Sequence, residues 1–400
     1  MIRSRSNASP RPRRRRAGFT LVELLVVILI LAVLIALLVP TVGGALRSAK
    51  NAAVGAEINQ LAQALNSFKA KYGDYPPSRI LLVENGNYGV VGSPLPLGPG
   101  DISVGQLAQR SLAALRKFFP KVTLSTSGPV FASGSLRWYD FNGNGVPDGP
   151  YILQGHQCLV FFLGGIPSAP TSEGISMTGF GKDPANPFTN SITGHSNYSG
   201  NRQAPLFEFA PSRLVPDPYI PYPSGVVNQL TLIPSQIPGY FDSLGNTLGD
   251  QINFYAYFSS YGNSGYDPND VNFPETDTFG AAAALAFKVA FPVVPPAVTG
   301  VAGTAGSPAP NPYTSTATIP VNPQAVPTGA PPTYYNPQTF QIISAGADGQ
   351  YGLGGQYTPE AGSALPLDGN SAVYLGTTND ERIRAREADN VTNFHSGRLQ

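Results

Sequence analysis

The chain begins with a hydrophobic segment that is long enough to cross a membrane as one helix. From Phe19 to Val39 there are 21 residues, and Glu23 is the only charged residue among them. An α-helix rises ~1.5 Å per residue, so this segment would be ~31 Å long. The hydrocarbon layer of a bilayer is ~30 Å thick. The pattern therefore predicts a transmembrane helix, and it is too long for the apolar region of an ordinary secretory signal peptide.

The apolar pattern continues beyond this segment with the spacing of a helix that packs along one side. Apolar residues recur every three or four positions, and they are Val54, Ile58, Leu61, Leu65, Phe68 and Tyr72. Pro40 with Gly43 and Gly44 predicts a kink or a locally melted turn. The Gly73–Pro77 segment predicts the helix end. We expect one helix over 19–75 whose second half packs on a folded body; a detached coiled coil is the alternative.

The rest of the chain shows short apolar runs separated by Gly, Pro, Asn and Ser. Amphipathic spacing predicts a helix over Val104–Phe118. Cys158–Leu163 predicts a buried strand or a short core segment. The aromatic and β-branched runs Phe254–Phe258 and Thr339–Ile343 predict further strands. The predicted fold class is α+β, with the long helix packed on an antiparallel sheet that carries long irregular insertions.

Composition suggests where the body is interrupted. The chain has 44 Gly and 40 Pro, and only 12% of its residues are charged, about half the usual ~25%. No charged residue occurs from 289 to 347. We predict a Pro/Ala/Gly/Thr-rich linker or surface excursion over 289–337, between a body at 76–288 and a C-terminal strand and loop region at 338–400. A glycan-bearing stalk would have a similar composition.

Positive charge is concentrated at the N-terminus. Seven arginines and no acidic residue lie in the first sixteen residues, and without them the formal net charge of +1 becomes −6. Arginines before a membrane span keep the short N-terminal piece, residues 1–18, in the cytoplasm. Because the rest of the chain is negatively charged, we expect no nucleic-acid partner for the body. The single cysteine, Cys158, excludes an intramolecular disulfide and a Cys-based zinc site, and we expect it to be an inert core thiol.

The junction between the arginines and the apolar segment resembles a known processing site. Arg13–Arg16 is followed by Gly18, Phe19 and Glu23, and Pro40 ends the apolar run. Together these residues resemble type IV prepilins and type II secretion pseudopilins, most of all the major pseudopilin, although the mature chain here is longer. The resemblance implies a pilin-like fold, cleavage after Gly18 by a prepilin peptidase, and methylation of the new N-terminal Phe19.

Glu23 needs a separate explanation, because a carboxylate within a membrane span is unfavourable. Insertion scales give ~2.5–3.5 kcal/mol at the helix centre and less near the interface. One interpretation is an interfacial acid that reaches the lipid headgroups. The resemblance implies another, in which Glu23 pairs with the free amine of Phe19 on a neighbouring subunit and sets the register of a filament.

A segment near the C-terminus carries the second part of the resemblance. Ser344-Ala-Gly-Ala-Asp348-Gly is similar to a segment of major pseudopilins that precedes a calcium-binding loop. The resemblance implies calcium ligands at Asp348 and Asp389, although this chain departs from the family pattern by inserting about thirty residues between the two pieces. Glycine-rich loops let backbone carbonyls join carboxylates around calcium. An Asp-Gly turn without a metal is the alternative.

A weaker calcium candidate lies in the body. The segment from Asp140 has oxygen-bearing side chains at positions 1, 3, 5 and 9 of an EF-hand-like loop and glycine at position 6. These side chains are Asp140, Asn142, Asn144 and Asp148. Position 12 is Tyr151, where such a loop normally has glutamate, and no flanking helices are predicted. A hairpin with Asx-turns explains the same residues.

We find no motif that predicts catalysis. The three histidines lack metal-ligand spacing, and no nucleotide-binding or nucleophile motif occurs in its required context. We predict a non-enzymatic pilin or pseudopilin in the inner membrane, with a single span and an extracytoplasmic body. Its implied partners are a prepilin peptidase, other pilin-like subunits and an inner-membrane assembly platform. A membrane-anchored binding module that uses the same export signal is the alternative, and a tethered hydrolase is a weaker one.

Overall fold

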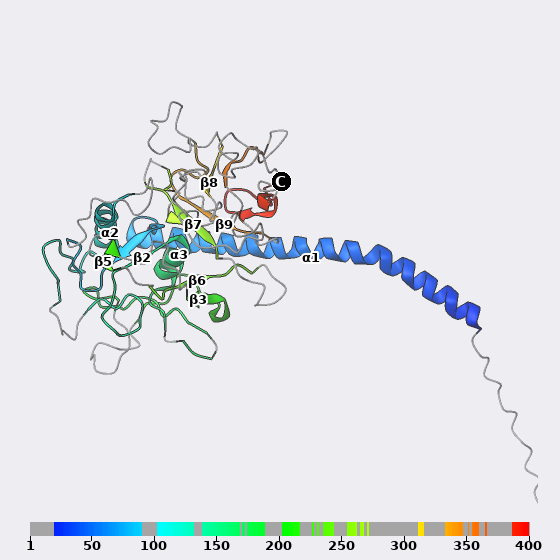
Figure 1. The fold of residues 1–400 in the computed structure, drawn as a ribbon, viewed down its shortest axis with the longest axis horizontal. Helices are drawn as coiled ribbons and strands as arrows, with labels where there is room; N and C mark the ends of the chain where they lie inside the picture. The colour runs from blue at the N-terminus through cyan, green and yellow to red at the C-terminus, as the bar shows by residue number, and fades with distance from the viewer. Residues whose placement is uncertain are drawn as a thin grey trace, which may run out of the picture. The chain divides into compact units, whose positions relative to one another are not determined.

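The computed structural model (Figure 1) describes residues 20–89, 102–131, 138–168, 170–172, 174–188, 202–216, 226–227, 230–231, 235–243, 254–261, 265–267, 270–271, 311–315, 333–346, 351, 354–359, 365 and 386–399. The chain divides into two compact units, residues 1–49 and residues 50–400. The predicted leader lies outside the described residues.

Helix α1 (Leu21–Tyr72) is continuous over the range that the apolar pattern predicts. Within the described chain it is the one helix long and apolar enough to cross a membrane, judged by length and composition, and its most apolar 18-residue stretch has a mean hydropathy of 3.4. The helix continues through Pro40, Gly43 and Gly44, so the prediction of a locally melted turn is wrong. Proline lacks an N–H donor and its ring crowds the carbonyl four residues earlier, which can bend a helix without ending it, and glycine can adopt helical angles.

The predicted apolar stripe on the second part of α1 is buried in the body. Its members Val54, Ile58, Leu61, Leu65 and Phe68 each expose at most 1% of their surface. Phe68 packs edge-to-face on Phe118 at 5.1 Å and on Phe162 at 5.6 Å between ring centroids. Each such buried side chain contributes roughly 1.5–3 kcal/mol. This confirms packing of the stripe on the body in place of a detached coiled coil.

Helix α2 (Val104–Phe118) has the bounds that its amphipathic pattern predicts. Ser103 begins it with a capping box, in which Ser103 Oγ accepts a hydrogen bond from Gln106 N–H and Gln106 Oε1 accepts one from Ser103 N–H. The two side chains satisfy backbone donors that the first helical turn leaves free. Pro120 follows the helix, as expected of a residue that cannot continue it.

Replacing Ser103 with alanine should lower the free energy of unfolding of the body by about 1 kcal/mol, because a backbone donor loses its acceptor. Chemical denaturation of the full chain in detergent, followed by the fluorescence of the single tryptophan, measures the change. Ser67→Ala is the matched control, since Ser67 donates to Gln63 O within α1 and caps nothing. An equal loss in both variants would contradict a capping role.

The apolar run at 158–163 is not a strand but part of helix α3 (Gly155–Gly164), all of whose residues are buried. A buried helix and a buried strand both give a continuous apolar run, so the sequence pattern could not separate them. Gln154 and Gln157 form a capping box at its start. Gly165, with φ of +84°, ends it in a conformation that favours glycine.

The strands form several small sheets around the second part of α1. Strand β7 (Ala256–Ser259) and β9 (Phe340–Ser344) fall within two residues of their predicted positions, and β11 (Val391–Thr392) pairs with the other edge of β9. Antiparallel pairs also join β1 (Ile80–Leu82) to β2 (Tyr151–Leu153), β3 (Leu214–Pro216) to β6 (Pro238–Tyr240), and β4 (Val226–Val227) to β5 (Leu230–Thr231). Figure 1 shows α3, β7 and β9 close to α1 in the body. The fold class is α+β, as predicted.

One strand comes from the uncharged stretch predicted as a linker. Strand β8 (Asn311–Thr314) pairs in parallel with β10 (Gly354–Gln356). Tyr313 is fully buried, and its backbone exchanges hydrogen bonds of 2.7 and 2.9 Å with the Gln341 side chain. These residues therefore belong to the folded body. Most of 289–337 lies outside the described residues, so the linker stays a prediction there.

Candidate functional site

Thr20 and Glu23 form a reciprocal cap at the start of α1. Glu23 Oε2 accepts hydrogen bonds of 2.8 Å from both Thr20 N–H and Thr20 Oγ1, and Thr20 Oγ1 accepts one of 3.2 Å from Glu23 N–H. This capping box places a carboxylate at the positive end of the helix dipole. Gly18 and Phe19 lie outside the described residues. Since Thr20 directly follows Phe19 in the sequence, Glu23 lies at the helix end that the predicted cleavage would leave.

Beyond Glu23, α1 presents apolar side chains on every side. The large hydrophobic residues between Leu21 and Leu46 expose between 45% and 79% of their surface. A helix that is apolar all round is stable when hydrocarbon or other apolar helices surround it. This part of α1 therefore has the chemistry of a membrane span or of a helix bundle.

A partly buried ion pair, which the local sequence pattern does not reveal, holds the second part of α1 to the body. Arg213 donates to both carboxylate oxygens of Glu57 at 2.7 and 2.8 Å. The Tyr240 hydroxyl donates to Glu57 Oε1 at 3.0 Å, and the Tyr255 hydroxyl to Oε2 at 2.6 Å. Burial raises the pKa of the Glu57 carboxyl, but the hydrogen bonds from Arg213 and Tyr255 outweigh it and leave that pKa below its usual value.

Three side chains around one carboxylate fix the second part of α1 against the body. Glu57 comes from the helix, Arg213 from the 3₁₀ turn η1 (Pro211–Arg213), Tyr240 from β6, and Tyr255 from the residue before β7. The sequence showed Glu57 only as a polar residue off the apolar stripe. Its partners are more than 150 residues away in the chain, and no local pattern connects them.

The side chains of the 140–148 loop bond mainly to the loop itself. Asp140 Oδ2 accepts from Gly145 N–H at 3.1 Å, and Asn142 Oδ1 accepts from Asn144 N–H at 3.1 Å. The Asn144 side-chain amide donates to Asp148 Oδ2 at 2.7 Å, while that of Asn142 lies 3.4 Å from both Asp148 oxygens. The structure thus brings together the four predicted side chains.

Glu84 is an additional acid at this loop. Its Oε2 accepts from Asp148 N–H at 2.7 Å, and its Oε1 accepts from the Tyr151 hydroxyl at 2.7 Å. Burial raises the pKa of Glu84 to about 8 despite these hydrogen bonds, and the charges of Asp148 and Asp140 raise it as well. Burial, with the nearby Asp148, likewise raises the pKa of Asp140 to about 6. The charges of Asp140 and Asp148 thus act on Glu84, and the charge of Asp148 acts on Asp140.

The second predicted calcium site is described only in part. Asp348 lies outside the described residues, whereas Asp389 ends the 3₁₀ turn η5 (Arg386–Asp389). Val391 of β11 pairs with Ser344 of β9. A Cβ added to Gly346 would lie 2.5 Å from the Asp389 carbonyl oxygen. The structure thus brings Asp389 next to the Ser344–Gly346 segment, and calcium binding at Asp348 and Asp389 stays a prediction.

Among the described residues, neither the buried thiol of Cys158 nor any group of His, Cys, Asp and Glu side chains forms a reactive centre. Cys158 is fully buried, and burial raises the pKa of its thiol well above the usual value, so the thiol is unreactive. No group of three or more His, Cys, Asp or Glu side chains in the described ranges lies close enough to hold a metal ion by itself.

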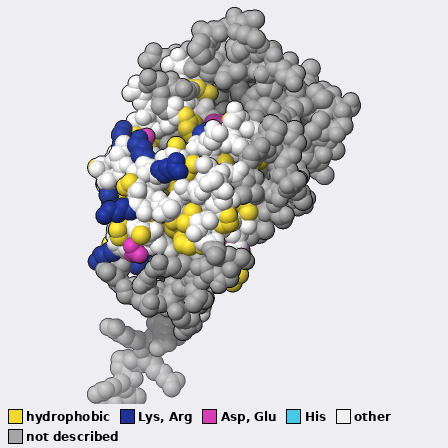
Figure 2. All heavy atoms as spheres, turned by 90° about the vertical axis from the view of Figure 1, so that its left-hand side faces the viewer, with side chains coloured by type: hydrophobic (Ala, Val, Ile, Leu, Met, Phe, Trp, Pro, Cys, Tyr) yellow, Lys and Arg dark blue, Asp and Glu magenta, His cyan; other side chains and the backbone are white. Residues whose placement is uncertain are grey.

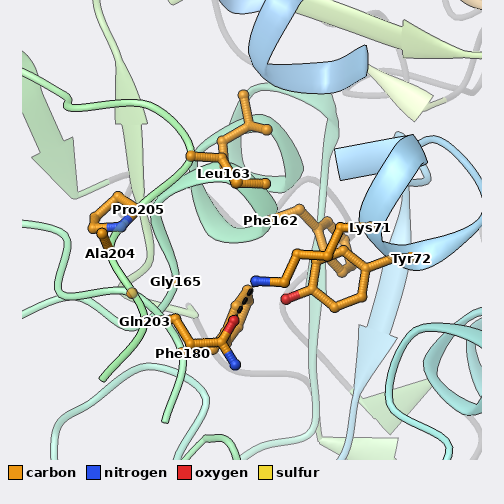
Figure 3. A pocket seen from close by; sticks show the side chains of 11 residues that line it. Lys71, Tyr72, Phe162, Leu163, Gly165, Phe180, Gln203, Ala204 and Pro205 are labelled. Carbon is orange, nitrogen blue, oxygen red and sulfur yellow. Dashed lines mark hydrogen bonds between the residues drawn. The ribbon is translucent and has the colours of Figure 1, made fainter. Parts of the chain in front are cut away.

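A small hollow lies between the end of α1, the end of α3 and residues 203–206 (Figure 3). Phe162, Phe180 and Tyr72 line its apolar side. The Lys71 ammonium donates to the Gln203 side chain across it, as the dashed line in Figure 3 shows. The space inside is that of about one water molecule. This hollow is therefore too small for a substrate.

Figure 2 shows Lys and Arg side chains along one edge of the body. Basic residues occupy the last turns of two helices, at Lys69 and Lys71 of α1 and at Arg116 and Lys117 of α2. Cations are favourable at helix C-termini, where carbonyl groups lack partners. Lys117 also pairs with Asp74 at 2.6 Å. The C-terminal ends of the two helices thus explain the positions of these four basic residues.

Comparison with known proteins gives one match. Residues 13–39 match the family model described as the prokaryotic N-terminal methylation motif. The matched range contains the four consecutive arginines, Gly18, Phe19 and Glu23, and it ends at Val39 of the apolar helix. No curated protein and no solved structure matches the chain. The chain therefore carries the prokaryotic N-terminal methylation motif, and over residues 13–39 it is similar to prepilin-type proteins.

Proposed function

We propose that this protein is a structural subunit of a type II secretion or type IV pilus-like filament, assembled through α1. One observation carries the proposal: the methylation motif over residues 13–39 contains the start of α1, whose large apolar side chains are exposed from Leu21 to Leu46. Such a helix is stable first in a bilayer and then among copies of itself. Among prepilin-type systems, the local resemblance at Ser344–Asp348 favours a secretion pseudopilus.

The proposal includes a defined place and defined partners. The arginine-rich leader stays in the cytoplasm, α1 spans the inner membrane once, and the body lies on the extracytoplasmic side. A prepilin peptidase removes the leader, and an inner-membrane assembly platform transfers the subunit to the filament. The work of the protein is assembly, and its partners are other pilin-like subunits.

Mass spectrometry of the N-terminal peptide from the membrane-extracted protein tests the proposal. We expect a chain that begins at Phe19 and carries one added methyl group on its amine. A lysine at position 18 (Gly18→Lys) should leave the leader attached, because a long charged side chain replaces the glycine before the predicted cleavage bond. Gly44→Ala is a matched control, since an added Cβ there meets no atom within 4 Å, and it should be processed normally.

Three outcomes are informative. A membrane-inserted protein that keeps its leader contradicts the proposal. A processed and methylated protein that cross-links into higher oligomers supports it. A processed protein that stays monomeric in the membrane contradicts filament assembly and favours a membrane-anchored binding module.

A further inference from the structure

We propose that the 140–148 loop binds a calcium ion together with Glu84, which supplies the carboxylate that the loop lacks at its twelfth position. The sequence places oxygen-bearing side chains at positions 1, 3, 5 and 9 of the loop, and a tyrosine at position 12. Loops of this kind normally take a bidentate glutamate from position 12. Calcium binding here would be independent of filament assembly and of the Asp348 and Asp389 candidate.

The loop already has a conformation that suits a cation. Gly143 and Gly145 have φ of +73° and +72°, a region in which glycine is strongly preferred. Gly145 is position 6, where calcium loops need glycine for a sharp turn. Its N–H donates to Asp140 Oδ2 at 3.1 Å. One oxygen of the position-1 carboxylate therefore closes the loop, and the other oxygen is left for a ligand.

That other oxygen is the independent observation. Asp140 exposes 4% of its surface, and its Oδ1 accepts no hydrogen bond of normal distance and angle in the described structure, although the N–H groups of Gly143 and Asn144 also point toward this carboxylate and lower its pKa. Buried polar atoms are normally paired, and a buried carboxylate oxygen without a partner is costly. A cation held by the loop would provide the missing partner.

Glu84 lies next to this loop. Strands β1 and β2 pair so that Leu82 lies opposite Tyr151, and Glu84 follows Leu82 by two residues. Its side chain is 1% exposed, and its carboxylate bonds the hydroxyl of Tyr151 and the backbone N–H of Asp148. The carboxylate of Glu84 thus contacts the hydroxyl of Tyr151, the residue at position 12, and the backbone of Asp148, the residue at position 9.

The oxygen inventory fits calcium. Carboxylates of Asp140, Asp148 and Glu84, amide oxygens of Asn142 and Asn144, and the carbonyl of position 7 give the six to eight oxygens that calcium takes. In the described chain, no three His, Cys, Asp or Glu side chains are already placed to hold a metal ion. Calcium binding therefore requires two movements. The side-chain amides of Asn142 and Asn144, which now donate toward Asp148, have to turn, and the Glu84 carboxylate has to move toward the loop. Flexible, oxygen-rich loops suit calcium better than magnesium, which requires stricter octahedral geometry.

The test is a calcium titration of the metal-free full chain in detergent, read by the fluorescence of Trp138, which lies two residues before Asp140 and is the only tryptophan. Terbium luminescence sensitised by the same tryptophan gives a second reading. We expect one saturable site, a higher melting temperature with calcium than with chelator, and a much weaker response to magnesium. Glu84→Gln and Asp140→Asn should each weaken calcium binding by at least about tenfold.

Two controls make the test specific. Asp183→Asn changes an acid in another turn, where Asp183 Oδ1 accepts from Ala185 N–H, and should bind calcium like the wild type. Asp389→Asn should also keep the Trp138 response. Two results would overturn the proposal. One is that the wild type does not bind calcium. The other is that Asp389→Asn loses calcium binding while Glu84→Gln and Asp140→Asn both keep it. If Glu84→Gln does not fold, Asp140→Asn with terbium luminescence decides alone.

Discussion

Replacing Glu23 with glutamine is expected to abolish incorporation into filaments while cleavage after Gly18 continues. Glutamine can replace glutamate in a capping box, so the start of α1 keeps its hydrogen bonds to Thr20, and only the charge is lost. In the proposed filament, the Glu23 carboxylate faces the free amine of Phe19 of a neighbour. An amine left without its acid inside an apolar bundle is strongly unfavourable. The measurement is the fraction of the protein recovered in sheared filaments or in cross-linked oligomers, with mass spectrometry of the N-terminus to confirm processing.

Thr20→Ala is the matched variant for this experiment. It removes the hydroxyl that bonds Glu23 in the structure but keeps the charge. A lost N-cap costs about 0.5–2 kcal/mol of helix stability, which a helix embedded in lipid tolerates. We therefore expect Thr20→Ala to assemble. If Thr20→Ala fails and Glu23→Gln assembles, Glu23 acts as a helix cap and the intersubunit pairing is wrong.

Replacing Arg213 with methionine is expected to lower the free energy of unfolding of the body by about 1.5–3 kcal/mol, the range for a hydrogen bond to a charged group. The substitution keeps the apolar stem but leaves the Glu57 carboxylate without its bidentate partner, with only the hydroxyls of Tyr240 and Tyr255 beside it. Denaturation of the full chain in detergent at neutral pH measures the loss. Arg116→Met is the control, because Arg116 donates to the Leu124 carbonyl and to no acid that the structure describes; about 1 kcal/mol or less is expected there.

The double variant Glu57→Leu with Arg213→Met separates charge from packing. Removing both partners of a buried ion pair is often nearly neutral, so most of the lost stability should return. A double variant that is as unstable as Arg213→Met would show that the guanidinium acts through packing and through its hydrogen bond to the Phe241 carbonyl.

The same pair predicts a pH dependence. The pKa of Glu57 is lowered in the folded protein below the ordinary value of 4.5, so its contribution to stability is complete at neutral pH and is lost as pH falls below 4.5 through the folded value. In Arg213→Met the carboxylate is buried without a cation, which raises its pKa, and acidification should then relieve the variant. The difference in stability between wild type and variant should therefore shrink as pH falls. A constant difference would contradict this assignment.

Local sequence patterns predicted the helices where one face meets the body and the other meets solvent. The buried faces of α1 and α2 are those that the apolar spacing over Val54–Phe68 and Val104–Phe118 predicts. A period of 3.6 residues is visible in the sequence whenever one side of a helix is polar. The same reasoning failed at α3. Its residues are buried on all sides, and a uniformly apolar run carries no period that distinguishes a helix from a strand.

The candidate sites divide in a similar way. Glu23 and the residues around Gly18 were visible in the sequence because processing and helix capping act within a few neighbouring positions. Glu57 and Glu84 were not, since their partners lie more than sixty residues away and come together only when strands pair and α1 docks. The side chains of the 140–148 loop were visible, but their completion by Glu84 was not.

The amino-acid sequence by itself determined the membrane-length helix, its motif and the α+β character of the body, because these depend on hydrophobicity and on contacts between near neighbours. Only the tertiary structure decided how the second part of α1 is held in the body and that Glu84 lies next to Tyr151, the twelfth residue of the loop. The physical reason is that burial and electrostatic pairing depend on distance in space, and strand register and helix docking set that distance independently of separation along the chain.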